Sequence, residues 1–200
     1  MILYLETNTL IGAAKGRVSH FDEVLTIPRE KLALALPSAC IFEALNALDD
    51  HRARERSFEA ALKMRVRELE RDRSGAVAAK VISGLKDAQL AYARYLDDLH
   101  SRLLRVVEAV SRRAISVDIV PATLERHAKT PIIKRAADNL ILAAVVQHAV
   151  DHPEPPATFL TDNTTDFDTP PVHTLLREHG IHYFTRPADF LGWFGAQRRE

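Results

Sequence analysis

One acidic stretch of the chain carries residue types that could do chemistry on a cation. The segment TFLTDNTTDF, residues 158–167, crowds Asp162, Asn163 and Asp166 directly after a short β-prone run. Carboxylates packed this closely at the end of a strand are costly unless a cation or solvent neutralises them. The stretch therefore predicts either a metal site or an exposed acidic turn.

Three further acids occupy comparable places. Glu6 directly follows the apolar run 2–5, Glu43 interrupts an apolar helical segment, and Asp138 falls in the first turn of another. Oxygen ligands of this kind suit hard cations such as Mg²⁺. Asp138 alone is equally well explained as a favourable charge at a helix start, and the acids of the turn as ordinary turn residues. Glu43 resists such an explanation, because a carboxylate on an apolar helix is seldom left unpaired.

The elements that would position these acids alternate between strand and helix. Either Thr7 or Asn8 is expected to cap the first helix, and Pro121 to end a strand. Short apolar runs predict strands at residues 2–5, 32–36, 115–120, 158–160 and 181–184. Helices are predicted over residues 7–15, 21–25, about 38–48, 136–149, 170–178 and 187–194. This alternation favours an α/β fold with a parallel sheet, in which ligands bind beyond the carboxyl ends of the strands.

Residues 52–113 have a different character. They lack proline, and apolar residues recur at three- and four-residue steps, which predicts two long amphipathic helices with a break near residues 73–75. The segment holds 15 Lys and Arg against 9 Asp and Glu, so it is net +6 while the rest of the chain is net −6. We therefore expect residues 1–51 and 114–200 to form the α/β domain, with 52–113 as an inserted helical hairpin. Nucleic-acid contact, a partner or dimer surface, and a solvated self-contained hairpin remain its three candidate roles.

Composition narrows the class of protein. With 200 residues and 46% hydrophobic content the chain can bury a proper core. A net charge of zero gives no overall attraction to nucleic acid or membrane. The single cysteine, Cys40, excludes an internal disulfide, and neither a signal peptide nor a membrane-spanning run is visible. A cytoplasmic location without membrane association is expected.

The motifs together resemble the PIN-domain ribonucleases. LYLETNTL, the helix with Glu43, the helix opening at Asp138 and LTDNTTDF occur in that family's order. The resemblance implies a three-layer fold with a central parallel β-sheet flanked by helices, to which the long hairpin is added. It also implies cleavage of RNA with Mg²⁺ or Mn²⁺ held by about four acids.

The resemblance also assigns roles to single residues. By similarity, Glu6, Glu43 and Asp138 match three of the family's acids, while Asp162 or Asn163 takes the fourth place. Asp166 is an additional acid. The small polar residues that position the ligands are matched by Asn8 and Thr161. Lys134 and Arg135, a turn before Asp138, could receive a phosphate or be ordinary solvated cations.

The function implied is a metal-dependent endoribonuclease acting as the toxin of a toxin–antitoxin pair. RNA, an antitoxin protein and a second copy of the chain are the implied partners. Two departures from the family pattern support an alternative function, a catalytically weakened module that binds RNA or a protein. The first-strand acid is Glu6 where the family usually has Asp, and Asn163 is neutral.

Overall fold

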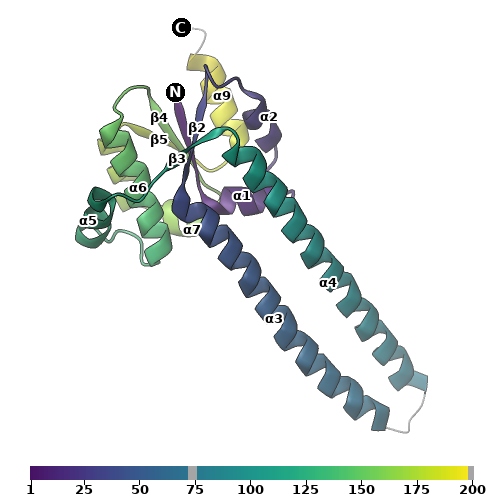
Figure 1. Ribbon diagram of the computed structural model, residues 1–200. Helices are drawn as coiled ribbons and strands as arrows, with labels where there is room; N and C mark the ends of the chain where they lie inside the picture. The colour runs from purple at the N-terminus through teal and green to yellow at the C-terminus, as the bar shows by residue number, and fades with distance from the viewer. Residues whose placement is uncertain (72–75, 198–200) are drawn as a thin grey trace. The chain divides into compact units, whose positions relative to one another are not determined.

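A five-stranded sheet in which every pair of neighbours is parallel forms the centre of the α/β unit (Figure 1). The computed structural model describes residues 1–71 and 76–197. The strands are β1 (Ile2–Leu5), β2 (Ala33–Pro37), β3 (Ala114–Val117), β4 (Ala157–Leu160) and β5 (Ile181–Phe184). They lie in the order β3-β2-β1-β4-β5, so that Tyr4 of β1 pairs with Ala35 on one side and Phe159 on the other.

The inner strands are mostly apolar and almost completely buried. All four residues of β1 and of β4 are buried, and only Ala33 of β2 is partly exposed. Continuous burial is typical of parallel strands that are covered by helices on both faces. The connections place all five carboxyl ends at one edge of the sheet, where Glu6 follows β1 and Thr161 follows β4.

Helices cover both faces of the sheet. The shorter helices are α1 (Thr7–Ala14), α2 (Phe21–Thr26), α5 (Pro121–Lys129), α6 (Ala136–Asp151), α7 (Thr164–Phe167), α8 (Pro170–Glu178) and α9 (Pro187–Gln197). Figure 1 shows α5 and α6 on one side of the sheet and α1, α2 and α9 on the other. This arrangement confirms the predicted three-layer α/β fold.

Two long helices account for the middle of the chain. These are α3 (Ser38–Arg71) and α4 (Ala76–Ser111). Contacts divide the chain into one unit of residues 1–44 and 103–200 and a second unit of residues 45–102. The helix that starts at Ser38 continues without interruption to Arg71, so the sequence-based boundary at residue 52 falls inside it. The predicted break at residues 73–75 lies outside the described residues.

Three local predictions were wrong. The N-cap of α1 is Glu6 rather than Thr7 or Asn8, because its carboxylate reaches the backbone N–H of Asn8. Pro121 does not end the strand, because β3 already stops at Val117; it begins α5, a helix that was not predicted, since proline is favoured at the first helical position. The acidic turn after β4 contains the four-residue helix α7.

Over residues 1–71 and 76–197, no helix combines enough length with enough apolar character to cross a membrane.

Candidate metal centre

Glu6 leaves β1 at the carboxyl edge of the sheet, and its side chain is fully buried. Its Oε2 accepts two hydrogen bonds, from the backbone N–H of Asn8 and from Oγ1 of Thr161, each 2.8 Å long. Its Oε1 is buried and has no hydrogen-bond partner among the described residues. The two bonds therefore fix the carboxylate while one oxygen remains free to bind a ligand.

Glu43 approaches the same place from the second turn of α3. Oγ1 of Thr7 donates a hydrogen bond of 2.6 Å to its Oε2. Thr7 is buried and is the first residue of α1, so the start of that helix fixes both Glu6 and Glu43. The role of Thr7 was missed in the sequence, where its position next to Glu6 was the available signal.

Asp138 completes the group from the first turn of α6, with a side chain only 1% exposed. Neither of its oxygens has a hydrogen-bond partner among the described residues. Nε of Arg135 lies 3.4 Å from its Oδ2, and a guanidinium nitrogen of Arg135 lies 3.9 Å from Oε1 of Glu43. The guanidinium, on a side chain 64% exposed, supplies positive charge beside these acids.

Asn139 holds the start of α6 in place, and its role, like that of Thr7, was not predicted from the sequence. Its Oδ1 accepts hydrogen bonds from the backbone N–H groups of Ile132 and Ile133, at 3.0 and 3.2 Å. Its Nδ2 donates to the backbone oxygen of His127 at 3.2 Å. These bonds tie the loop before α6 to the end of α5, and so fix the segment that carries Arg135 and Asp138.

The three acids form one cluster. One carboxylate oxygen each from Glu6, Glu43 and Asp138 lies within 4.8 Å of the other two. Burial raises the pKa of Glu6 to about 8, and repulsion from the other two carboxylates adds to the rise. Burial also raises the pKa of Asp138 to about 6, with Glu43 and Asp166 contributing and Arg135 opposing. The cluster is therefore short of positive charge at neutral pH.

The candidates for the fourth position behave differently from one another. Asn163 caps α7: its Oδ1 accepts from the N–H of Asp166 at 3.3 Å, and its Nδ2 donates to Oδ2 of Asp166 at 3.0 Å. Asp166 is close enough to raise the pKa of Asp138. Asp162 is exposed, and its Oδ2 would lie 3.2 Å from a Cβ added to Gly12 of α1. Among the described residues, Asp162 is not one of the acids that gather around Glu6, Glu43 and Asp138.

The predicted positioning residues also differ. Thr161 bonds Glu6 through its hydroxyl, and that oxygen in turn accepts from the N–H of Asn163 at 2.9 Å. The contact of Asn8 with Glu6 runs through its backbone N–H rather than its side chain. Lys134 is exposed, whereas Arg135 reaches the cluster.

The donor set fits a hard divalent cation. It consists of carboxylate oxygens alone, as Mg²⁺ and Mn²⁺ prefer. Three of these oxygens, Oε1 of Glu6 and both of Asp138, are buried without a hydrogen bond from any described residue. A buried carboxylate oxygen left in this way is unfavourable unless a cation approaches it. Glu6, Glu43 and Asp138 are therefore the residues that could hold the ion, with Asp166 beside them.

Comparisons with known proteins agree with this description. A family model described as PIN domain matches residues 3–167. The solved structures that the chain is similar to include the crystal structure of VapBC2 from Rickettsia felis bound to a DNA fragment from their promoter. That alignment has a TM-score of 0.48 and 12% identity, and covers 92% of this chain and 100% of the other. No curated protein matches the chain.

Proposed function

The chain belongs to the PIN-domain family, and from this membership and the carboxylate cluster we propose that it hydrolyses RNA phosphodiester bonds with Mg²⁺ or Mn²⁺. The observation that carries the proposal is the convergence of Glu6, Glu43 and Asp138 within 4.8 Å, with three buried oxygens unbonded. When bound, the ion would neutralise charge on the phosphoryl oxygens and lower the pKa of a water.

The protein's own residues would bind and orient the reacting groups. Thr7 and Thr161 hold the carboxylates of Glu43 and Glu6 in fixed positions through their hydroxyl groups. Such outer contacts typically matter 10- to 100-fold for metal affinity or activity. Asn163 holds Asp166 at the edge of the cluster, so we assign it a positioning role in place of a ligand role.

Arg135 has two uses in this proposal. Without a metal, its guanidinium compensates the negative charge of Glu43 and Asp138. With the metal present, that compensation is no longer needed and the exposed guanidinium can bind an RNA phosphate in bidentate fashion. Lys134, exposed on the same loop, would add a second phosphate contact.

The narrower proposal is that the enzyme is the toxin of a toxin–antitoxin pair and acts on cytoplasmic RNA. Family membership makes this role available but does not distinguish it from other PIN nucleases. An antitoxin encoded by a gene next to the gene of this protein would copurify with the protein and block cleavage. A neighbouring reading frame whose product leaves cleavage unchanged would contradict the toxin role.

The decisive experiment measures cleavage and metal binding on the same protein. Purified full-length chain is incubated with structured RNAs in Mn²⁺, in Mg²⁺ and in excess EDTA, and Mn²⁺ binding is measured by calorimetry. We expect cleavage that EDTA abolishes and that Asp138→Asn removes. The matched control is Asp22→Asn, which removes an exposed acid from the first turn of α2 and should change nothing.

The outcomes separate the candidate functions. Undiminished cutting in EDTA would refute the metal-dependent mechanism. Mn²⁺ binding without cleavage of any RNA would favour the alternative, a weakened module that retains the site without the reaction.

A further inference from the structure

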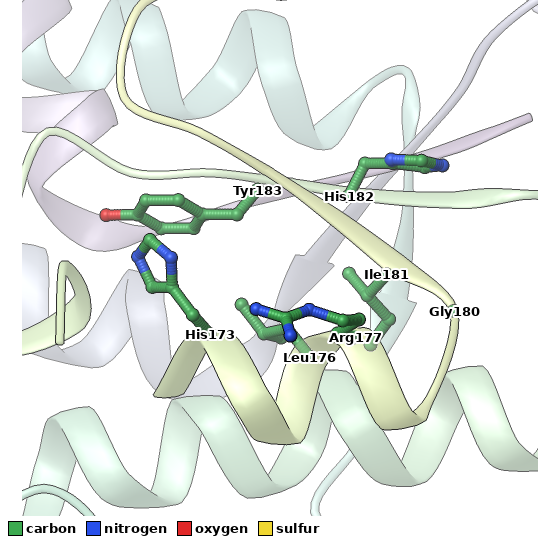
Figure 2. A pocket seen from close by; sticks show the side chains of 7 residues that line it. All are labelled: His173, Leu176, Arg177, Gly180, Ile181, His182 and Tyr183. Carbon is green, nitrogen blue, oxygen red and sulfur yellow. The ribbon is translucent and has the colours of Figure 1, made fainter. Parts of the chain in front are cut away.

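A cavity of about 280 Å³ lies between α8 and the edge strand β5, outside the carboxylate cluster. Its lining includes His173, Leu176 and Arg177 of α8 and Ile181 and Tyr183 of β5. Figure 2 shows the rings of His173 and Tyr183 facing one another at one end, with Arg177 on the same helix as His173. The volume is just below the roughly 300–1,000 Å³ of typical small-molecule pockets.

The lining combines aromatic faces with positive charge. The ring centroids of His173 and Tyr183 are 4.7 Å apart, with their planes 49° from parallel. Arg177 follows His173 by four residues, which puts both side chains on one face of α8. Arg177 makes no ion pair within residues 1–71 and 76–197, and the cavity lining contains no acid. An aromatic face beside an unpaired guanidinium suits a base and its phosphate.

The hydroxyl of Tyr183 adds a hydrogen-bond donor. Its oxygen is buried and has no partner among the described residues. Nε2 of His173 lies 2.8 Å from Oδ1 of Asp168, so the imidazole forms an ion pair with that carboxylate when it is protonated. The hydroxyl of Tyr183 therefore has hydrogen-bonding capacity that the described residues do not use.

The strand β5, one wall of the cavity, is hydrogen-bonded to the segment that holds Glu6. The backbone N–H of Thr161, whose hydroxyl holds Glu6, donates to the backbone oxygen of Phe184, the residue after Tyr183. Burial raises the pKa of Tyr183, and the negative charges of Asp168 and Glu6 raise it further. Tyr183 thus stays neutral and lies within electrostatic reach of a carboxylate of the cluster.

We propose that this cavity binds one unpaired nucleotide of the RNA, with its base against Tyr183 and His173 and its phosphate at Arg177. The inference rests on the proposed nuclease function and adds a recognition subsite to it. Because a base must be unstacked to enter, the subsite selects single-stranded RNA beside the cut. Stacking accepts every base, so it contributes more to affinity than to the choice of sequence.

The test is abasic scanning combined with mutation. A short single-stranded RNA that spans a mapped cut is labelled with fluorescein, and a set of copies each lacks one base. Binding is measured by anisotropy to the full-length Asp138→Asn chain, in which cleavage is expected to be absent. Tyr183→Leu, Tyr183→Phe and His173→Ala are then made in that background.

We expect one position at which loss of the base weakens binding roughly 5- to 150-fold, the range of base stacking on aromatic side chains. In Tyr183→Leu, removal of that base should not weaken binding any further. Tyr183→Phe keeps the ring, so removal of the base should still weaken its binding by most of the factor seen without the substitution. His173→Ala should reduce the penalty at the same position, and it serves as a second probe should Tyr183→Leu fail to fold.

Arg177 is tested by salt dependence. Arg177→Gln should lower the slope of log binding constant against log salt concentration by about 0.7, the value for one phosphate contact on a single strand. The control Arg112→Gln removes an exposed guanidinium of the same unit, which is paired with Glu108, and should leave the slope unchanged. An unchanged slope in Arg177→Gln would remove the phosphate contact from the proposal.

Failure of the subsite differs from failure of the function. If the parent protein cleaves RNA in Mn²⁺ but the abasic profile is identical in Tyr183→Leu and His173→Ala, the cavity holds no base. If the parent neither binds nor cleaves RNA, both the subsite and the proposed function are overturned.

Discussion

Asp138→Asn should make the metal-free protein more stable while abolishing the proposed cleavage activity. The carboxyl of Asp138 ionises in a buried place, so its pKa rises from 3.8 to about 6. An acidic group whose pKa is higher in the folded than in the unfolded state does not lower the free energy of unfolding at a pH below its unfolded pKa, because it is then protonated in both states. Its cost grows as pH rises towards the folded pKa and is complete above it. Asparagine has the same shape and never bears this charge.

The size of the effect follows from two independent estimates. At 1.36 kcal/mol for each pKa unit, this rise in the pKa of Asp138 lowers the free energy of unfolding by roughly 3 kcal/mol. Two unit charges 4.8 Å apart repel by roughly 3–4 kcal/mol at an effective dielectric constant near 20. For a chain of this length, 3 kcal/mol corresponds to a shift in Tm of roughly 6–12 °C. We take this as the upper limit of the gain.

The assay is thermal unfolding by circular dichroism in EDTA. At about pH 8 the Asp138→Asn chain should melt several degrees above the parent, and the difference should shrink as pH falls below about 6 and be small near pH 4. Added Mn²⁺ should raise the Tm of the parent and have little effect on the variant. The control Asp22→Asn separates this effect from loss of a helix-dipole contact, which lowers stability. A variant that melts below the parent in EDTA at pH 8 would refute the crowding of charge.

Four further predictions concern the same site. Glu6→Asp draws the carboxylate back by about 1.5 Å, one carbon–carbon bond, from its donors Asn8 and Thr161. Mn²⁺ affinity measured by calorimetry should therefore fall roughly 10- to 100-fold. Equal affinities of the parent and the variant would mean that Glu6 is not a ligand. Thr7→Val removes the hydroxyl that holds Glu43 and should lower Mn²⁺ affinity roughly tenfold, with unchanged binding as the contrary result. Arg135→Gln should strengthen Mn²⁺ binding yet weaken RNA cleavage, because one guanidinium serves both states; changes in the same direction would contradict that dual role. Mn²⁺ affinity of the parent should fall as pH drops below about 8 and again below about 6, because Glu6 and then Asp138 take up protons. An affinity that calorimetry finds constant across these pH values would exclude this coupling between metal binding and protonation.

The sequence predicted the sheet because burial leaves a strong local pattern. The inner strands are continuous apolar runs, and α8 carries its own boundary signals in Pro170 and Gly180. Gly180 adopts a left-handed conformation at φ 66°, which glycine alone enters without strain. The short helix α7 escaped prediction because it is stabilised by the side-chain cap of Asn163 rather than by any apolar period.

The candidate site was predictable in residue type but not in geometry. Six polar residues were proposed as ligands, and among the described acidic, histidine and cysteine side chains the structure brings Glu6, Glu43 and Asp138 within reach of one ion. Asp162 and Asn163 are neighbours in sequence, yet one is exposed and the other is buried in the cap of α7. Which side chain faces the cluster depends on how the chain leaves β4, and a single sequence does not encode that direction in any short pattern.

The central position of β1 has a consequence for the order in which the site forms during synthesis. Glu6 and Thr161, which share a hydrogen bond beyond β1 and β4, are 155 residues apart. At about 5–20 residues per second, a ribosome takes roughly 8–30 s to make the chain between them. Throughout that interval the first strand lacks one of its two neighbours, and Glu6 lacks the threonine that fixes it. The nascent chain therefore cannot fix the carboxylate of Glu6 in its final position until most of the chain has been translated.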